Sequence, residues 1–102
     1  MTVYLFTVKD PLGQEVRLTE NCHKFHILLE HPELSDVNQI AEAIASPAFI
    51  AQDAVDPQRL VYYRPYQVQP QRWIKVVVKQ GEVITAYRVK RLKKGETIRW
   101  RQ

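Results

Sequence analysis

The hydrophobic pattern of this chain changes its period near residue 58, and this change limits the folds that the chain can adopt. Before that point, two segments carry apolar residues at the three- and four-residue spacing of a helix. After it, apolar and polar residues alternate, and Val, Ile, Tyr and Trp become frequent, as is typical of strands. Helices followed by a run of strands indicate the α+β class, in which helices pack on an antiparallel sheet.

The first thirty residues predict a β-hairpin followed by a short helix. Residues 3–8 and 15–19 alternate in polarity, and residues 10–13 between them have the Pro and Gly of a turn. Thr19 is a suitable N-cap for the helix, and Pro32 disfavours the helical conformation at the residue before it, so the helix should end shortly before Pro32. The expected buried stripe of this helix is Cys22, Phe25, Leu28 and Leu29.

A second helix is expected to begin after Ser35, which can cap it, and to end at Ser46-Pro47. Residues 53–58 contain two acids and Pro57, and should form a loop. The stripe that the second helix should bury is Val37, Ile40, Ala41 and Ile44.

Four strands are expected after the loop, and turns that contain glycine separate the second from the third and the third from the fourth. They are Leu60–Arg64, Trp73–Lys79, Glu82–Arg91 and Thr97–Arg101. We therefore expect a single α+β domain over residues 1–102, with an N-terminal β-hairpin and two short helices packed on a four-stranded antiparallel β-sheet.

The length of the turn near Gly81 decides which side chains share a face with Lys75. A two-residue turn places Lys75 beside Ala86. A three-residue loop, with Gly81 in the left-handed conformation, places Lys75 opposite Thr85, with Tyr87 on the same face. Both arrangements leave one largely apolar face, so the hydrophobic pattern does not distinguish between them.

Charge is divided along the chain in the same way as the hydrophobic pattern. Residues 1–56 contain three basic and nine acidic residues, a formal net charge of −6, whereas residues 57–102 contain twelve basic and two acidic residues, a net charge of +10. Because the basic half is also the strand-rich half, many of its cations should stand in rows on a sheet. Such a surface attracts a polyanion.

Several other classes of protein do not fit the composition. No apolar run approaches the roughly 20 residues of a membrane span, and the N-terminal residues lack the pattern of a secretory signal. The single cysteine, Cys22, excludes an intramolecular disulfide and a cysteine-rich zinc site. We expect Cys22 to be a small buried residue, and the protein to be cytoplasmic, without membrane contact.

His26 and His31 are the candidates for proton transfer, because histidine titrates near neutral pH. The alternative for each is an ordinary helix histidine with one local hydrogen bond. The segment from His26 to His31 is one residue too long for the inverted zincin signature, so the two rings would not share a helix face. His23 and His26 would share a face, but no third ligand is evident. We expect neither a metal nor another cofactor.

A sheet face that carries Lys75, Thr85 and Tyr87 would offer a cation for phosphate charge, hydroxyls for orientation and a ring for base stacking. The alternative is that these are ordinary strand residues. Tyr62 and Arg64 share a face of the preceding strand, although the pattern leaves open which face. The residues expected to contact RNA are Tyr62, Arg64, Arg72, Lys79, Arg88, Lys90 and Arg91.

The order of several short motifs resembles the barnase/EndoU/colicin/RelE-like (BECR) nuclease superfamily, and most of all its phage-associated branch. The resemblance runs from about residue 19 to residue 100, and it depends on the ordered set more than on any one motif. The motifs are His26…His31-Pro32-Glu33, Ser46-Pro47, Val61-Tyr62-Tyr63-Arg64, Val76-Val77-Val78-Lys79 and Ile84-Thr85-Ala86-Tyr87.

The resemblance implies a metal-independent endoribonuclease with helices packed on a four-stranded antiparallel sheet. It also favours the three-residue loop, because that loop gathers the family's strand residues on one face. The residues that match the catalytic positions are His26 or His31 for acid–base work, Lys75 with Arg64 as strand cations, and Thr85 with Tyr87 as the late-strand hydroxyl motif.

Two functions are open at this point. In the first, a toxin-like enzyme cleaves RNA by attack of a 2′-hydroxyl on the adjacent phosphorus, with histidine moving protons and cations stabilising the phosphate. In the second, a non-catalytic module holds RNA or an acidic partner protein on the basic sheet, which requires the cations and rings but not the histidines. RNA is the expected partner, and an acidic antitoxin or immunity protein is a second candidate.

Overall fold

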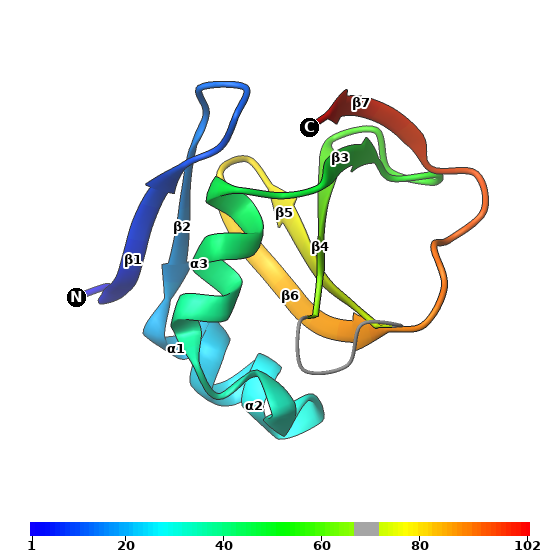
Figure 1. Cartoon of the computed structure of the whole chain (residues 1–102). Coiled ribbons are helices and arrows are strands. Elements are labelled where there is room, and N and C mark those ends of the chain that lie inside the picture. Colours follow the sequence, from blue (N-terminus) through cyan, green and yellow to red (C-terminus); the bar gives the residue numbers. More distant parts are fainter. Residues whose placement is uncertain (67–71) are drawn as a thin grey trace.

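The expected hairpin and helices are present, but the strands join into a larger sheet than expected (Figure 1). The computed structural model describes residues 1–66 and 72–102. In these residues, one mixed seven-stranded sheet has the order β1-β2-β6-β5-β4-β3-β7. Its strands are β1 (Tyr4–Lys9), β2 (Glu15–Thr19), β3 (Phe49–Gln52), β4 (Arg59–Pro65), β5 (Trp73–Lys79), β6 (Glu82–Val89) and β7 (Thr97–Arg101). The helical elements are α1 (Glu20–Cys22), the π-helical turn η1 (His23–Ile27), α2 (Leu28–Glu30), the 3₁₀ turn η2 (Pro32–Leu34) and α3 (Val37–Ala45).

The expected four-stranded antiparallel sheet is wrong in two respects. Strand β3, whose four residues are too few to show a period, pairs with β4 on one side and β7 on the other, so β7 does not adjoin β6. The N-terminal hairpin also belongs to the sheet, because β2 runs parallel to β6 and pairs with it at Arg17 and Glu82. The backbone N–H of Arg17 donates to the Gly81 carbonyl over 2.8 Å and fixes this junction.

The first helix is wound in two ways along its length. Thr19 caps it as expected, because its Oγ1 accepts a hydrogen bond from the backbone N–H of Cys22 over 3.0 Å. The following turn is π-helical, and the N–H of Leu28 reaches back to the carbonyl of His23, five residues earlier. This insertion changes the angular position of each side chain that follows it.

Because of this change in winding, the residues that the first helix buries differ from those of the predicted stripe. His23 and Ile27 are buried, whereas Phe25 and Leu29 are 61% and 74% exposed. The predicted stripe is therefore wrong at Phe25 and Leu29, since a regular α-helical period does not hold through η1. In α3 the regular period does hold, and Ile40, Ala43 and Ile44 are buried. The N-cap of α3 is Asp36 rather than Ser35, since Asp36 Oδ1 accepts from Asn38 N over 3.0 Å.

The β5–β6 hairpin combines a two-residue turn with a bulge. Gln80 and Gly81 have φ values of 54° and 76°, and Lys79 pairs with Glu82 across the turn, so the expected three-residue loop is wrong. The register then shifts by one residue at Ile84, so that Val77 pairs with Thr85 and Lys75 with Tyr87. The bulge thus places Thr85 and Tyr87 on the face of Lys75, which the turn alone would not do.

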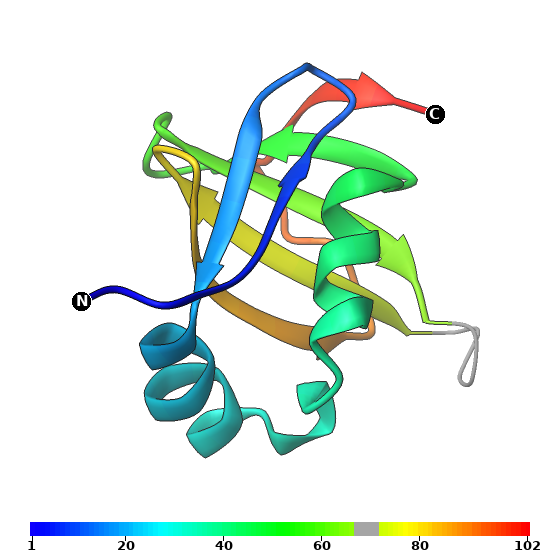
Figure 2. The same ribbon diagram turned by 90° about the vertical axis from the view of Figure 1, so that its left-hand side faces the viewer.

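The two faces of the sheet are covered differently. The helices pack on one face, over a core that includes the fully buried side chains of Tyr62 and Val76. The segment 90–96, which joins β6 to β7, runs along the other side, away from α3 (Figures 1 and 2). A smaller buried cluster lies on that second face, formed by Ala51, Val61, Tyr63 and Val77.

Candidate functional site

Lys75 lies at the centre of the sheet face that is turned away from the helices. It is 5% exposed, because β5 lies between β4 and β6 in the sheet. The register places Tyr63 of β4 and Tyr87 of β6 directly beside it. The Lys75 Nζ atom is 5.5 Å from the centroid of the Tyr63 ring and 5.6 Å from that of Tyr87. The ammonium therefore lies between two aromatic rings that stabilise its charge.

Glu96 completes the surroundings of Lys75 from the end of the segment 90–96. Its Oε2 atom is 3.2 Å from Lys75 Nζ, and the two side chains are 4% and 6% exposed. The hydroxyl of Tyr63 donates a hydrogen bond to Glu96 Oε1. Sequence reasoning missed Glu96, although one signal was present: it is one of only two acidic residues after Pro57.

The charges of this cluster are fixed by burial and by the neighbouring groups. Burial and the hydrogen bond to Glu96 raise the pKa of Tyr63 to about 12. Burial alone would lower the pKa of Lys75, but its interactions with Tyr63, Tyr87 and Glu96 outweigh that effect and raise the pKa above its usual value. At neutral pH the cluster therefore contains a charged Lys75 and a protonated, hydrogen-bond-donating Tyr63.

His31 joins this face by stacking on Tyr87. The two ring centroids are 5.1 Å apart, with an angle of 27° between the planes. Helix α2 ends before His31, and Pro32 opens η2, so the chain bends here against β6. The His31 side chain is 28% exposed, and its Nε2 atom is 3.9 Å from Glu30 Oε2. The ring of Tyr87 therefore lies between the imidazole of His31 and the ammonium of Lys75.

The other two histidines have different surroundings. His26 has a side chain that is 45% exposed, and its Nδ1 atom is 4.0 Å from Glu30 Oε1. The contacts described for the structure bring His31, and not His26, to Tyr87. His23 is buried, with Nε2 3.0 Å from the Leu34 carbonyl, so it connects the first helix to η2.

Tyr62 and Arg64 share a face, as expected, but it is the helix-covered face and not that of Lys75. Tyr62 is fully buried, and its hydroxyl donates to Asp10 Oδ2 over 2.5 Å, so its ring is inaccessible to an RNA base. Arg64 Nη1 donates to the Ser46 carbonyl over 2.6 Å. These two residues therefore stabilise the fold and do not join the Lys75 cluster.

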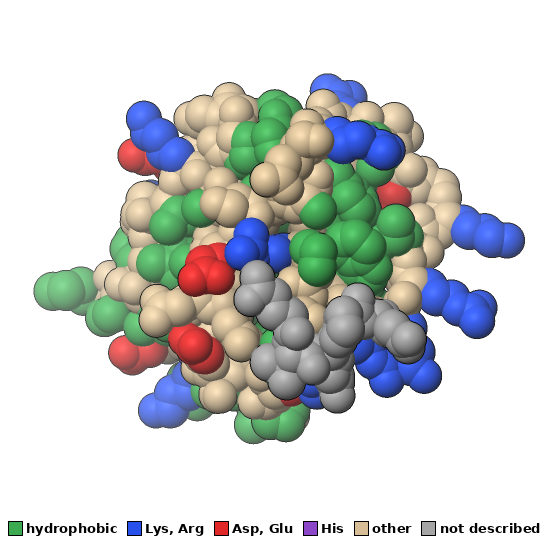
Figure 3. Space-filling view, in the orientation of Figure 1, with side chains coloured by type: hydrophobic (Ala, Val, Ile, Leu, Met, Phe, Trp, Pro, Cys, Tyr) green, Lys and Arg blue, Asp and Glu red, His purple; other side chains and the backbone are tan. Residues whose placement is uncertain are grey.

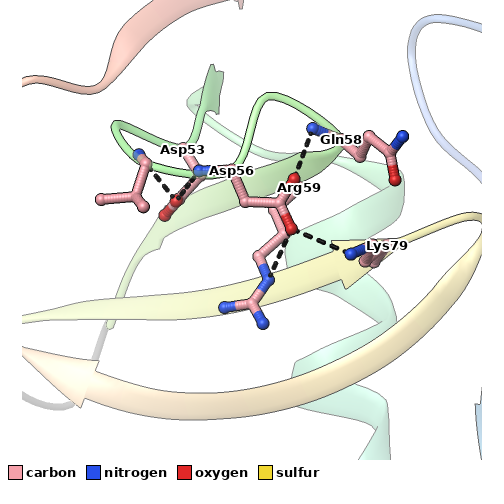
Figure 4. Close-up of polar contacts among 6 residues, drawn as sticks. Asp53, Asp56, Gln58, Arg59 and Lys79 are labelled. Atoms are coloured by element: carbon pink, nitrogen blue, oxygen red, sulfur yellow. Dashed lines mark hydrogen bonds and ion pairs between the residues drawn. The ribbon is translucent and has the colours of Figure 1, made fainter.

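Two more of the expected RNA contacts have acidic partners within the chain. Lys79 Nζ donates to Asp56 Oδ2 over 2.9 Å, in the network at the β3–β4 turn that also contains Arg59 (Figure 4). Arg88 Nε lies 3.9 Å from Glu33 Oε2, on the helix-covered face. Hydrogen bonding from Lys79 lowers the pKa of Asp56.

The remaining expected cations lie outside the Lys75 cluster. Arg72 is partly exposed just before β5, and its carbonyl accepts a hydrogen bond from the N–H of Tyr66. The segment 90–96 carries exposed cations, and Figure 3 shows Lys and Arg side chains projecting on the side where this segment runs. These exposed cations are Lys90, Arg91, Lys93 and Lys94.

Cys22 is half-buried and has a structural role beside the bulge. Its thiol donates to the carbonyls of Val83 and Ile84, at 3.2 and 3.4 Å. Burial raises the pKa of the Cys22 thiol, so the nucleophilic thiolate is disfavoured.

Residues 1–66 and 72–102 contain no group of three or more His, Cys, Asp or Glu side chains that could hold a metal ion. No helix in the same residues is long and apolar enough to cross a membrane. Comparisons of the chain with protein-family models, with curated proteins and with solved structures give no match.

Proposed function

We propose that the protein is a metal-independent endoribonuclease whose active site is the sheet face around Lys75, Tyr87 and His31. The observation that carries the proposal is the stacking of His31 on Tyr87, whose ring also lies 5.6 Å from Lys75 Nζ. A group that can move protons, a hydroxyl and a cation are the parts that cleavage of a phosphodiester requires. They come from a helix end and two strands, which agrees with the BECR-like motifs.

The reaction supported by this set is transesterification within RNA. His31 removes the proton of a 2′-hydroxyl, whose oxygen attacks the adjacent phosphorus, and the bond from phosphorus to the 5′-oxygen breaks. The leaving oxygen takes a proton, which the hydroxyl of Tyr87, whose ring stacks on His31, would donate. Lys75 and Thr85 lie on the same face and would stabilise the non-bridging oxygens. The products are a 2′,3′-cyclic phosphate and a 5′-hydroxyl.

The first prediction concerns the histidines. We expect His31→Ala to reduce cleavage of labelled RNA by about 10²- to 10⁴-fold, the usual contribution of a general acid or base. His26→Ala removes the same side chain from the preceding helical turn, and it should retain most of the activity because His26 lies beside Glu30 and not beside Tyr87. The assay is run in excess EDTA, and the products are analysed for cyclic phosphate ends.

Two outcomes would contradict this assignment. Equal activity of the wild type and His31→Ala would exclude His31 as the proton-transfer group. Intact RNA in every sample, with retention that weakens as salt is added, would favour the binding module instead. One observation supports that second function: Lys75 is already paired with Glu96, while four exposed cations lie together on the segment 90–96. In that case RNA or an acidic partner protein, such as an antitoxin or immunity protein, would bind the segment.

A further inference from the structure

We propose that Glu96 acts as an internal anion that occupies the phosphate position beside Lys75, so that this position opens only when the segment 90–96 moves. The identity of the ligand as a phosphate rests on the function proposed above. The competition between Glu96 and an external anion does not, and it can be measured without RNA cleavage.

The groups around the Glu96 carboxylate are those that bind an oxyanion. Lys75 provides a charged ammonium 3.2 Å from Oε2, and Tyr63 donates its hydroxyl to Oε1. A phosphate offers oxygens to the same two donors, with more negative charge. The position is also buried, because the side chains of Lys75 and Glu96 are only 6% and 4% exposed. Electrostatic attraction is stronger at a buried position than at the surface.

The contact of Glu96 with its partners is incomplete. Its Oε2 atom is buried, and although it is within ion-pair distance of Lys75, it has no hydrogen-bond partner of acceptable geometry among residues 1–66 and 72–102. Most buried polar atoms in proteins have such a partner, so this carboxylate is a suboptimal occupant of the position. An anion with more oxygens could satisfy the donors better.

The segment that carries Glu96 also carries exposed cations that could bind an anion. Residues 90–96 form neither helix nor strand, and the side chains from Lys90 to Lys94 are exposed while Glu96 is buried. An RNA chain that binds the exposed cations would bring further phosphates close to Lys75. Because a buried lysine is strongly destabilised without a counter-charge, we expect Glu96 to leave more readily when another anion takes its place beside Lys75. RNA would then open the site that it needs.

The test is phosphate binding by Glu96→Gln, which keeps the size of the side chain and the acceptor for Tyr63 but removes the charge. We expect inorganic phosphate to bind this variant at least about tenfold more tightly than the wild type, because the competing negative charge is gone. Binding is measured by calorimetry at constant ionic strength, with chloride as the balancing anion.

Two controls separate this effect from net charge and from general opening. Glu82→Gln makes the same change in charge at an exposed site, where Glu82 is paired with Arg17 at 3.7 Å, and it should bind phosphate as the wild type does. The double variant Lys75→Met with Glu96→Gln should not show the increase in phosphate affinity, because the ammonium that binds phosphate is absent. Equal phosphate affinity of Glu96→Gln and Glu82→Gln would overturn the proposal.

A measurement on the wild type covers the case in which Glu96→Gln does not fold. Phosphate, compared with chloride at equal ionic strength, should accelerate amide hydrogen exchange in residues 93–97, because it displaces Glu96. Exchange that phosphate leaves unchanged would overturn the proposal.

The results distinguish failure of this proposal from failure of the proposed function. If Glu96→Gln binds phosphate more tightly but RNA stays intact, only the nuclease function is rejected. RNA cleavage by the wild type, with no gain for Glu96→Gln, rejects the competition only.

Discussion

Single side chains of this sheet differ in whether their charge is available to a ligand. Lys75 and Lys79 both point from β5, yet each contacts a carboxylate of the same chain, Glu96 and Asp56 respectively. Lys90 and Arg91, which follow directly after the end of β6 at Val89, are exposed. The position of a cation on its strand therefore determines whether a carboxylate of the same chain pairs with it, and a paired cation is less available to RNA.

The pairing of Lys79 with Asp56 predicts a dependence of stability on pH. The pKa of Asp56 is lower in the folded protein, chiefly because Lys79 donates a hydrogen bond to the ionised carboxylate. The stabilisation is thus complete above the unfolded pKa of about 3.9 and is lost as pH falls through the folded pKa. Asp56→Asn should be less stable at neutral pH and should lose less stability on acidification than the wild type.

Chemical denaturation at a series of pH values checks this prediction. Lys79→Met is the matched variant, because it removes the donor and leaves the carboxylate in place. Like Asp56→Asn, it should reduce the loss of unfolding free energy as the pH is lowered. The double variant should lose little more stability than either single variant, because both changes remove the same interaction. An acid limb that neither change alters would show that the pair does not contribute.

At the level of elements, the β5–β6 turn holds two parts of the sheet together. Gly81 has a φ of 76°, and a Cβ atom added to it would lie 3.0 Å from the backbone carbonyl of Glu15 on β2. Gly81→Ala should therefore cost the roughly 1–2 kcal/mol of a left-handed alanine and also separate β2 from β6. We expect a loss of unfolding free energy above that figure, measured by denaturant titration.

Gly13 provides the matched control for this substitution. Its φ is 86°, close to that of Gly81, but nothing lies within 4 Å of an added Cβ. Gly13→Ala should therefore lose only the roughly 1–2 kcal/mol of unfolding free energy that a left-handed alanine costs. If both variants lose the same free energy, the close approach of β2 to the turn does not contribute to stability.

The bulge in β6 and the bend at Pro32, after the first helix, position the candidate site. The bulge at Ile84 puts Tyr87 opposite Lys75, and the bend at Pro32 puts His31 on Tyr87. Both are local irregularities of winding or register. They are frequent next to functional sites because they re-aim a side chain without changing the rest of the fold.

On the scale of the whole molecule, the two halves of the chain differ in both charge and structure. Residues 1–56, with a net charge of −6, supply all the helices in the described part of the chain, whereas residues 57–102 carry +10 and supply β4 to β7. The segment 90–96 presents four exposed cations on the side away from α3. RNA should approach the protein from that side.

This polarity predicts how RNA retention responds to salt. For single-stranded nucleic acid the slope of log affinity against log salt changes by about 0.7 for each phosphate contact. Lys93→Ala with Lys94→Ala should therefore weaken retention and reduce the slope by about 1.4. Filter binding at several salt concentrations measures both quantities.

The control keeps the same change in net charge on the other half of the chain. Lys9→Ala with Lys24→Ala removes two exposed cations from residues 1–56 and should leave the slope nearly unchanged. Equal effects of the two pairs would mean that RNA responds to net charge and not to the segment 90–96.

Much of the local structure was predictable from the sequence because it depends on neighbours along the chain. The strands at Glu15–Thr19, Trp73–Lys79 and Thr97–Arg101 lie where alternation places them. The Thr19 cap is also confirmed, since an N-cap needs only a side-chain oxygen and the N–H groups that follow it. The pairing of Lys75 with Glu96 was not predictable in this way, because the two residues meet only after β7 joins β3.

Hydrophobic period and composition were enough to predict the α+β class, the N-terminal hairpin, the two helical segments and the polarity of charge, whereas the short strand β3 was missed. The tertiary structure alone decided the seven-stranded order, the face that each strand residue occupies and the covering of Lys75 by Glu96. The physical reason is that one added residue, as at Ile84, changes the face of all that follow. Such a shift is selected by packing between distant elements, which a local pattern does not contain.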